Sequence, residues 1–338
     1  MSVIRKSYID VAKGLLMLMV VYGHIYGNAV SMMDFTSIGI IHQSCSLFIP
    51  FYMPCFFVLT GFCSSFNKPF RPFLLKSLKT IILPGVTLSF LLLLTNLNHD
   101  SVIKWVKNIV LYGGDYWFLS SLFLARIVYW FIDNFIKRVR FKTLFCVLSF
   151  VLGYSLSIIY SGVEYWWFVH ALLLLPYLGF GQLLKRYDNK RGIVYALIYF
   201  VVFVVTALLA HYGVFKIDYY YHVPGISQKL LNVNNTMVTS LIVLSLSGSL
   251  LLFSISKKIN TNKLLEYLGK NSLVIYCVHG TILQIAIRRV GGAILQFNNS
   301  EITCAMSILI AFIVTIAISC FIAYILNQKY IKILIGKF

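Results

Sequence analysis

Two histidines and an arginine lie inside stretches that are apolar enough to cross a membrane. His24 stands in YIDVAKGLLMLMVVYGHIYG, His279 in NSLVIYCVHG, and Arg126 directly follows YWFLSSLFLA. Imidazole titrates near neutral pH and stays uncharged in a low-dielectric site, so such a histidine can take a proton from a hydroxyl group. Ionisable groups within membrane spans are usually functional, because lipid penalises them. The sequence therefore indicates acid–base chemistry inside a membrane.

Lys13 and His24 share one side of the first apolar stretch. A helix turns about 100° and rises about 1.5 Å per residue, so eleven steps end about 20° from the starting direction and about 16 Å further on. Lys13 then lies near the cytoplasmic edge, where it can extend to water or pair with Asp10. We expect both side chains to face a polar cavity entered from the cytoplasm. The alternatives are a packing hydrogen bond for His24 and an interfacial anchor for Lys13.

The other two ionisable residues fall at a depth compatible with that of His24. His279 lies about nine residues in from the cytoplasmic start of its stretch, and Arg126 about ten residues in from the outer start of its own. We expect the two histidines and Arg126 to converge near the midplane of the membrane. Charged groups at this depth are equally expected along a transport path, so a transporter or flippase is the alternative function.

The elements that position these residues are apolar helices of spanning length. The chain has 338 residues, of which 59% are hydrophobic and only 12% charged. This composition predicts an all-α integral membrane protein, a bundle of about ten transmembrane helices in one domain over residues 1–338. Gly61, in the second helix, should let a neighbouring helix approach closely. The expected spans are 11–31, 44–66, 78–95, 116–136, 141–160, 165–184, 192–210, 237–256, 271–290 and 302–326.

The basic residues alternate between the two sides of this predicted bundle. With a cytoplasmic N-terminus, 22 of the 29 lysines and arginines fall in cytoplasmic segments and six outside, so both termini are expected in the cytoplasm. The net charge of +19 therefore reflects topology, and we expect no nucleic-acid partner. No small-residue cleavage site follows the first stretch, which we interpret as a retained helix. Seven cysteines without a CxxC motif predict neither a disulfide framework nor a metal site.

Five stretches, in this order, resemble the membrane-bound acyltransferase-3 family. The likeness is greatest to the branch of fucose O-acetylases and enterobacterial surface-glycan O-acetyltransferases. Lys13 stands where much of the family has arginine, as do Lys76 and Lys79, and lysine keeps the charge but lacks the planar fork. The stretches are YIDVAKGLLMLMVVYGH (8–24), PCFFVLTGF (54–62), KSLKTIILPG (76–85), YWFLSSLFL (116–124) and NSLVIYCVHG (271–280).

This resemblance implies an O-acyltransferase in the bacterial cytoplasmic (inner) membrane. The expected donor is cytoplasmic acyl-CoA, in the first instance acetyl-CoA. The expected acceptor is a sugar hydroxyl of a surface polysaccharide or its lipid-linked precursor. His24 could act as the base or first carry the acyl group itself, and both routes stay open. His279 could bond the substrate or the thioester oxygen, or only pack.

The remaining roles are assigned as follows. Donor phosphates are expected at Lys13, Lys76 and Lys79, because the donor is polyanionic. Asp10 is expected to orient Lys13, and is grouped with the substrate-contacting residues Arg126, Trp117 and Tyr116. The outer carboxylates Asp115 and Glu164 and the segment 211–236, with its run DYYYHVPG, could contact sugar, although aromatic residues also gather at membrane interfaces without a ligand.

Two rival classes remain beside the acyltransferase. A transporter or flippase should show inverted repeats or paired interrupted helices, and the sequence has neither. A glycan polymerase or ligase usually needs a large outer loop, whereas the longest predicted here, 211–236, has about 26 residues. The resemblance favours the acyltransferase.

Overall fold

The computed structural model of the chain describes residues 6–33, 39–94, 99–159, 165–187, 193–211, 235–287, 289 and 301–337. These residues form helices and the turns between them, without a β-strand. The all-α architecture expected from the apolar stretches is therefore confirmed.

Each of the ten predicted spans overlaps a helix of the structure. In the part of the chain that is described, seven helical stretches are long and apolar enough to cross a membrane, and three shorter apolar stretches accompany them. The chain is thus a multi-pass α-helical membrane protein. The principal helices are α1 (Ser7–Met33), α2 (Gly39–Cys63), α4 (Leu83–Leu93), α6 (Trp117–Phe135), α7 (Val139–Ile159), α8 (Phe168–Tyr187), α9 (Ile193–His211), α11 (Asn235–Ile259), α13 (Ser272–Ala286) and α15 (Glu301–Leu326).

Several short helices join or cap these spans. The predicted span 78–95 begins earlier than expected, because α3 (Phe70–Ser77) continues through a π-helical segment, η1 (Leu78–Ile82), into α4. A second π-helical segment, η3 (Asn108–Tyr112), continues α5 (His99–Lys107) and precedes α6. The others are α12 (Lys263–Lys270), which follows α11, and η6 (Lys332–Ile335) near the C-terminus.

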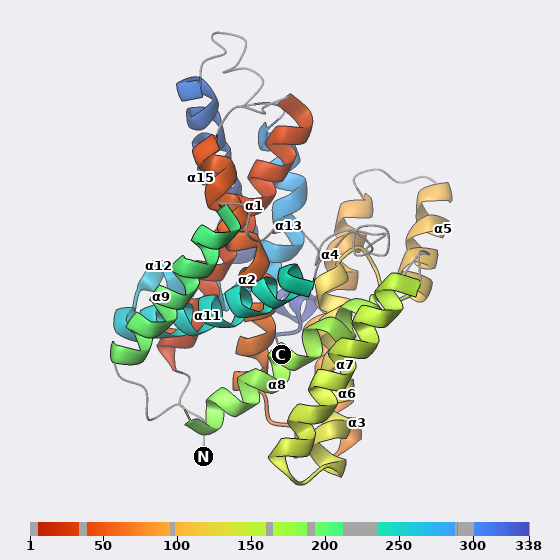
Figure 1. Cartoon of the computed structure of the whole chain (residues 1–338). Coiled ribbons are helices and arrows are strands. Elements are labelled where there is room, and N and C mark those ends of the chain that lie inside the picture. The colour runs from red at the N-terminus through yellow and green to blue at the C-terminus, as the bar shows by residue number, and fades with distance from the viewer. Residues whose placement is uncertain are drawn as a thin grey trace.

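Helix α1 lies at the centre of the bundle, in contact with α2, α11, α12, α13 and α15. Figure 1 shows α1, α13 and α15 running together, apart from the group formed by α3, α6 and α7. Residues on several sides of α1, among them Val11, Leu16 and Val21, are completely buried. A helix enclosed in this way can hold polar side chains away from lipid.

Glycines allow α12 to approach the main chain of α1. A Cβ added at Gly14 would lie 2.1 Å from the main-chain oxygen of Leu265, and one added at Gly269 would lie 1.8 Å from that of Asp10. Both distances are far below van der Waals contact, so only glycine fits at these two positions. The close contact fixes α12 against the first turns of α1.

The same device joins α2 and α8. A Cβ at Gly61 would lie 2.0 Å from the main-chain oxygen of Leu178, and one at Gly181 would lie 2.1 Å from that of Val58. The close helix approach predicted for Gly61 is therefore confirmed.

A polar network holds the start of α13. The Nδ2 group of Asn327 donates to Oδ1 of Asn271 at 2.8 Å, and Nζ of Lys337 donates to the same oxygen at 3.0 Å. Asn271 directly precedes α13, so this network fixes the N-terminal end of the helix that carries His279.

Candidate active site

His24 on α1 and His279 on α13 are in direct contact. Their ring centroids are 4.9 Å apart and the ring planes meet at 74°, an edge-to-face arrangement. His279 is buried and His24 is partly buried. The convergence expected for the two histidines is present, and it places two imidazoles side by side inside an apolar bundle.

The hydrogen bonds of the two rings fix their tautomers. Nδ1 of His24 lies 2.9 Å from the main-chain oxygen of Val20, and Nδ1 of His279 lies 2.7 Å from that of Tyr276. A carbonyl oxygen can only accept, so each Nδ1 carries the proton and donates it. Each neutral ring therefore presents the lone pair of Nε2, the atom that a general base needs.

The Nε2 atom of His279 is buried and has no hydrogen-bond partner among the residues that the structure describes. A buried polar atom without a partner is unusual and calls for an explanation. Two imidazoles in contact can also hold one added proton much more easily than two, because like charges repel at this distance. The pair is therefore expected to carry at most one added proton.

Two tyrosines, one at the start of α6 and one on α13, lie on the side of His279. The Tyr116 hydroxyl, at the start of α6, donates to the main-chain oxygen of Cys277 at 2.9 Å. The Tyr276 ring lies 5.9 Å from that of His279 and 6.0 Å from that of Tyr116. Tyr116 thus lies near the pair, as its predicted substrate role requires. Tyr276 was missed, although its spacing of three residues from His279 places both on one helix face.

Trp117 belongs to an aromatic cluster that is linked to the histidine pair through Phe118, whose ring lies 6.1 Å from that of Trp117 and 5.3 Å from that of Tyr276. The Trp117 ring lies 6.3 Å from that of Trp167 and 5.4 Å from that of His170, which is completely buried on α8. Trp166 and Trp167 both adopt φ of 54°, a left-handed conformation that non-glycine residues rarely take. Strained backbone of this kind is often found at functional sites. No motif in the sequence pointed to Trp166, Trp167 or His170.

Arg126 lies apart from the histidines. Its Nη1 group donates to the Ser64 hydroxyl at 2.8 Å, just beyond the end of α2, and its guanidinium lies 5.3 Å from the Phe73 ring centroid. The expected convergence of Arg126 with the two histidines is therefore wrong. The reason is that α6 already starts beside α13 at Tyr116, so Arg126 lies about 15 Å further along the helix.

The predicted donor-side residues lie on two elements. Lys76 lies in the last turn of α3 and Lys79 lies in η1, and both side chains are exposed. Lys13 is partly buried on α1, and Asp10 is buried where α1 meets α12. Within the described residues no ion pair joins Lys13 to Asp10, so the pairing considered for them is not found.

Two further expectations can be located only in part. Asp115 accepts a hydrogen bond from the side chain of Asn108, next to the start of α6. Glu164 and most of the predicted outer segment 211–236, including its tyrosine run, lie outside the described residues.

Fold and site together define a multi-pass helical membrane protein with a histidine pair in its interior. A family model described as an acyltransferase domain matches residues 6–324. The chain therefore belongs to the acyltransferase-3 family, and it is a membrane acyltransferase. The resemblance seen in the sequence is confirmed over nearly the whole chain. No curated protein and no solved structure matched the chain.

Proposed function

We propose that this acyltransferase moves an acetyl or other acyl group from cytoplasmic acyl-CoA to a sugar hydroxyl. The acceptor is a bacterial surface polysaccharide or its lipid-linked precursor. The enzyme would sit in the cytoplasmic membrane with ten spans and both termini in the cytoplasm. The single observation that carries the proposal is the contact of His24 with His279, which places two imidazole rings together inside an apolar bundle.

Transfer to a sugar hydroxyl needs a base at the moment of attack, because such hydroxyls are poor nucleophiles near neutral pH. In the proposed step, Nε2 of His24 takes the hydroxyl proton while the hydroxyl oxygen attacks the carbonyl carbon of the thioester. The carbon–sulfur bond then breaks, and the coenzyme A thiolate leaves and takes up the proton. The ester forms on the sugar, and His24 returns to its neutral state.

His279 has a narrower range of roles than its position in the sequence suggests. With Nδ1 donating to Tyr276, the neutral ring offers only an acceptor at Nε2. It can accept a hydrogen bond from an acceptor hydroxyl, whereas it could donate to the thioester oxygen only when protonated. Its tautomer therefore favours orientation of the sugar over stabilisation of the oxyanion.

Donor and acceptor would approach the histidines from opposite sides of the membrane. Lys76 and Lys79 are exposed cations on α3 and η1 and suit the phosphates of the donor. Lys13 would receive the same anion closer to His24. Tyr116 lies near the histidines at the start of α6 and suits the acceptor. The transporter alternative has no comparable support, because the matching family is one of acyltransferases.

The test is mass spectrometry of surface glycan from cells with the gene, without it, and with the His24→Ala variant. Only the intact protein should add acyl mass to the glycan. The matched control is His99→Ala on α5, which removes a histidine from another element and should leave acylation unchanged. If the intact protein adds no acyl group, the proposed function is wrong. If His24→Ala is produced normally and still acylates, only the assignment of the base fails.

A further inference from the structure

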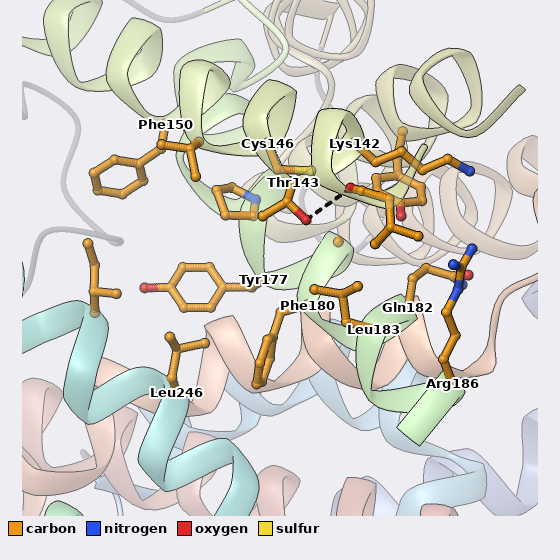
Figure 2. Close-up of a pocket in the computed structure, with 16 residues that line it drawn as sticks. Lys142, Thr143, Cys146, Phe150, Tyr177, Phe180, Gln182, Leu183, Arg186 and Leu246 are labelled. Carbon is orange, nitrogen blue, oxygen red and sulfur yellow. Dashed lines mark hydrogen bonds between the residues drawn. The ribbon is translucent and has the colours of Figure 1, made fainter. Parts of the chain in front are cut away.

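A cavity of about 270 Å³ lies between α7, α8 and α11, and Tyr129 of α6 also lines it. Its lining is mostly apolar, with Phe150 and Leu246 at one end. Figure 2 shows Lys142 and Arg186 together at the opposite end. A cavity that is apolar along its length and basic at one end matches a ligand with an apolar chain and an anionic head.

The course of α8 contributes to this space. Pro176, which lines the cavity, lies inside α8 and has no N–H group to donate to the carbonyl of Leu172. The Ser149 hydroxyl of α7, which donates to the Cys146 carbonyl of its own helix at 2.7 Å, also lies 3.3 Å from the Leu172 carbonyl. The neighbouring helix thus offers this carbonyl a weak partner, and the cavity lies beside the proline.

The cavity borders a surface that faces lipid. Val147 lines it and is 51% exposed, and the exposed residues Leu148, Val151 and Leu152 lie on the same helix. Large apolar side chains exposed along a membrane helix contact acyl chains. A lipid could therefore enter from the side of the bundle without crossing water.

The basic end of the cavity has an excess of positive charge. Lys142 pairs with Asp133, whereas Arg186 has no carboxylate partner in the part of the chain that is described. Lys137 and Arg138 lie directly before α7. A zwitterionic headgroup would bring its own ammonium close to this cluster, so the charge favours a headgroup with a net negative charge.

We propose that this groove binds an anionic phospholipid of the adjacent membrane leaflet. Its phosphate would lie at Arg186, and one acyl chain would follow the cavity toward Phe150 and Leu246. The lipid would bridge α7 to α8 and α11. No lining residue comes from α1 or α13, so the site is distinct from the histidine pair and its occupation does not depend on the proposed reaction.

The experiment is native mass spectrometry of the full chain in detergent, titrated with phosphatidylglycerol or phosphatidylethanolamine carrying the same acyl chains. The wild type should bind phosphatidylglycerol at least about fivefold more tightly than phosphatidylethanolamine, which corresponds to ~1 kcal/mol for one basic residue near a headgroup with a net negative charge. Arg186→Gln should remove this preference, and Arg186→Lys should keep most of it. Leu246→Trp should weaken the binding of both lipids, because the larger side chain fills the apolar end of the cavity.

The matched control is Arg140→Gln, which removes the same charge from an exposed residue outside the cavity lining. It should change phosphatidylglycerol affinity by less than about twofold. Equal binding of the two lipids to the wild type would overturn the proposal. Equal losses for Arg186→Gln and Arg140→Gln, both with wild-type melting temperature, would do the same. Tighter binding of a polyprenyl phosphate than of phosphatidylglycerol would reject the phospholipid as occupant.

Discussion

Helices α1 and α7 are both apolar and long enough to cross a membrane, yet their surroundings differ sharply. In the apolar part of α1 that is long enough to cross a membrane, 61% of the residues are buried, against 11% in the corresponding part of α7. Helix α1 is enclosed by five others and carries His24, whereas α7 packs mainly on α8 and turns large apolar side chains outward. The difference separates the helix that can hold chemistry from the helix that can meet lipid.

The largest effect is expected at His24, where the enclosed helix supplies the base. His24→Gln keeps a polar side chain but removes the basic lone pair, so kcat should fall by about 100-fold or more. The measurement is release of free coenzyme A by purified protein supplied with acetyl-CoA and an acceptor glycan. Activity within about threefold of wild type would remove His24 from the mechanism.

The next effect concerns the contact that holds α1 against α12. Gly269→Ala places a Cβ against the main chain of Asp10, so the free energy of unfolding should drop by about 2 kcal/mol or more. Melting in detergent checks this. The matched control is Gly280→Ala on α13, where a Cβ meets no atom within 4 Å and stability should stay level or rise. Equal destabilisation by both variants would contradict the close contact.

A direct comparison of the two helices uses one substitution on each. Leu16 is completely buried on α1, and Leu148 is 50% exposed on α7. Leu16→Ala leaves a cavity among helices and should cost about 2–4 kcal/mol. Leu148→Ala exchanges one lipid-facing apolar group for another and should cost less than about 0.5 kcal/mol. Melting curves of the two variants that coincide would show that α7 is as enclosed as α1.

The smallest effect is expected at Tyr116, which connects α6 to α13. Tyr116→Phe removes the hydrogen bond to the Cys277 carbonyl and keeps the ring. The free energy that this hydrogen bond contributes, about 1 kcal/mol, should therefore be lost. We expect a severalfold drop in kcat/KM for the acceptor and an unchanged KM for acetyl-CoA. A change confined to the donor would place Tyr116 on the other side of the site.

The sequence predicted the long helices well, because each apolar stretch of spanning length carries its own signal. It missed α12, whose eight residues are too few to span and whose partner, α1, lies far away in the chain. Its N-cap could have been recognised, since Asn262 accepts a hydrogen bond from the Leu265 amide three residues later. The place where α12 docks could not, because it depends on glycines of two separate helices.

For the site, the depth of each residue along its helix could be predicted from the sequence, but the position at which the helices begin relative to one another could not. This sufficed for His24 and His279, and failed for Arg126, because α6 starts beside the middle of the neighbouring α13. The cluster of Trp117 with Trp167 and His170 was missed for another reason. It depends on a left-handed turn at Trp166 and Trp167. Neither position is a glycine, the residue from which such a turn is usually predicted.

Because the start of α13 is anchored, the number of residues between this anchor and His279 determines whether His279 faces His24. Asn271 is held by Asn327 and Lys337, and seven residues lie between it and His279. One residue inserted in this interval would swing His279, together with the rest of α13 that follows it, by about 100° around the helix and away from His24. The interval can therefore tolerate changes of residue type far better than a change of length.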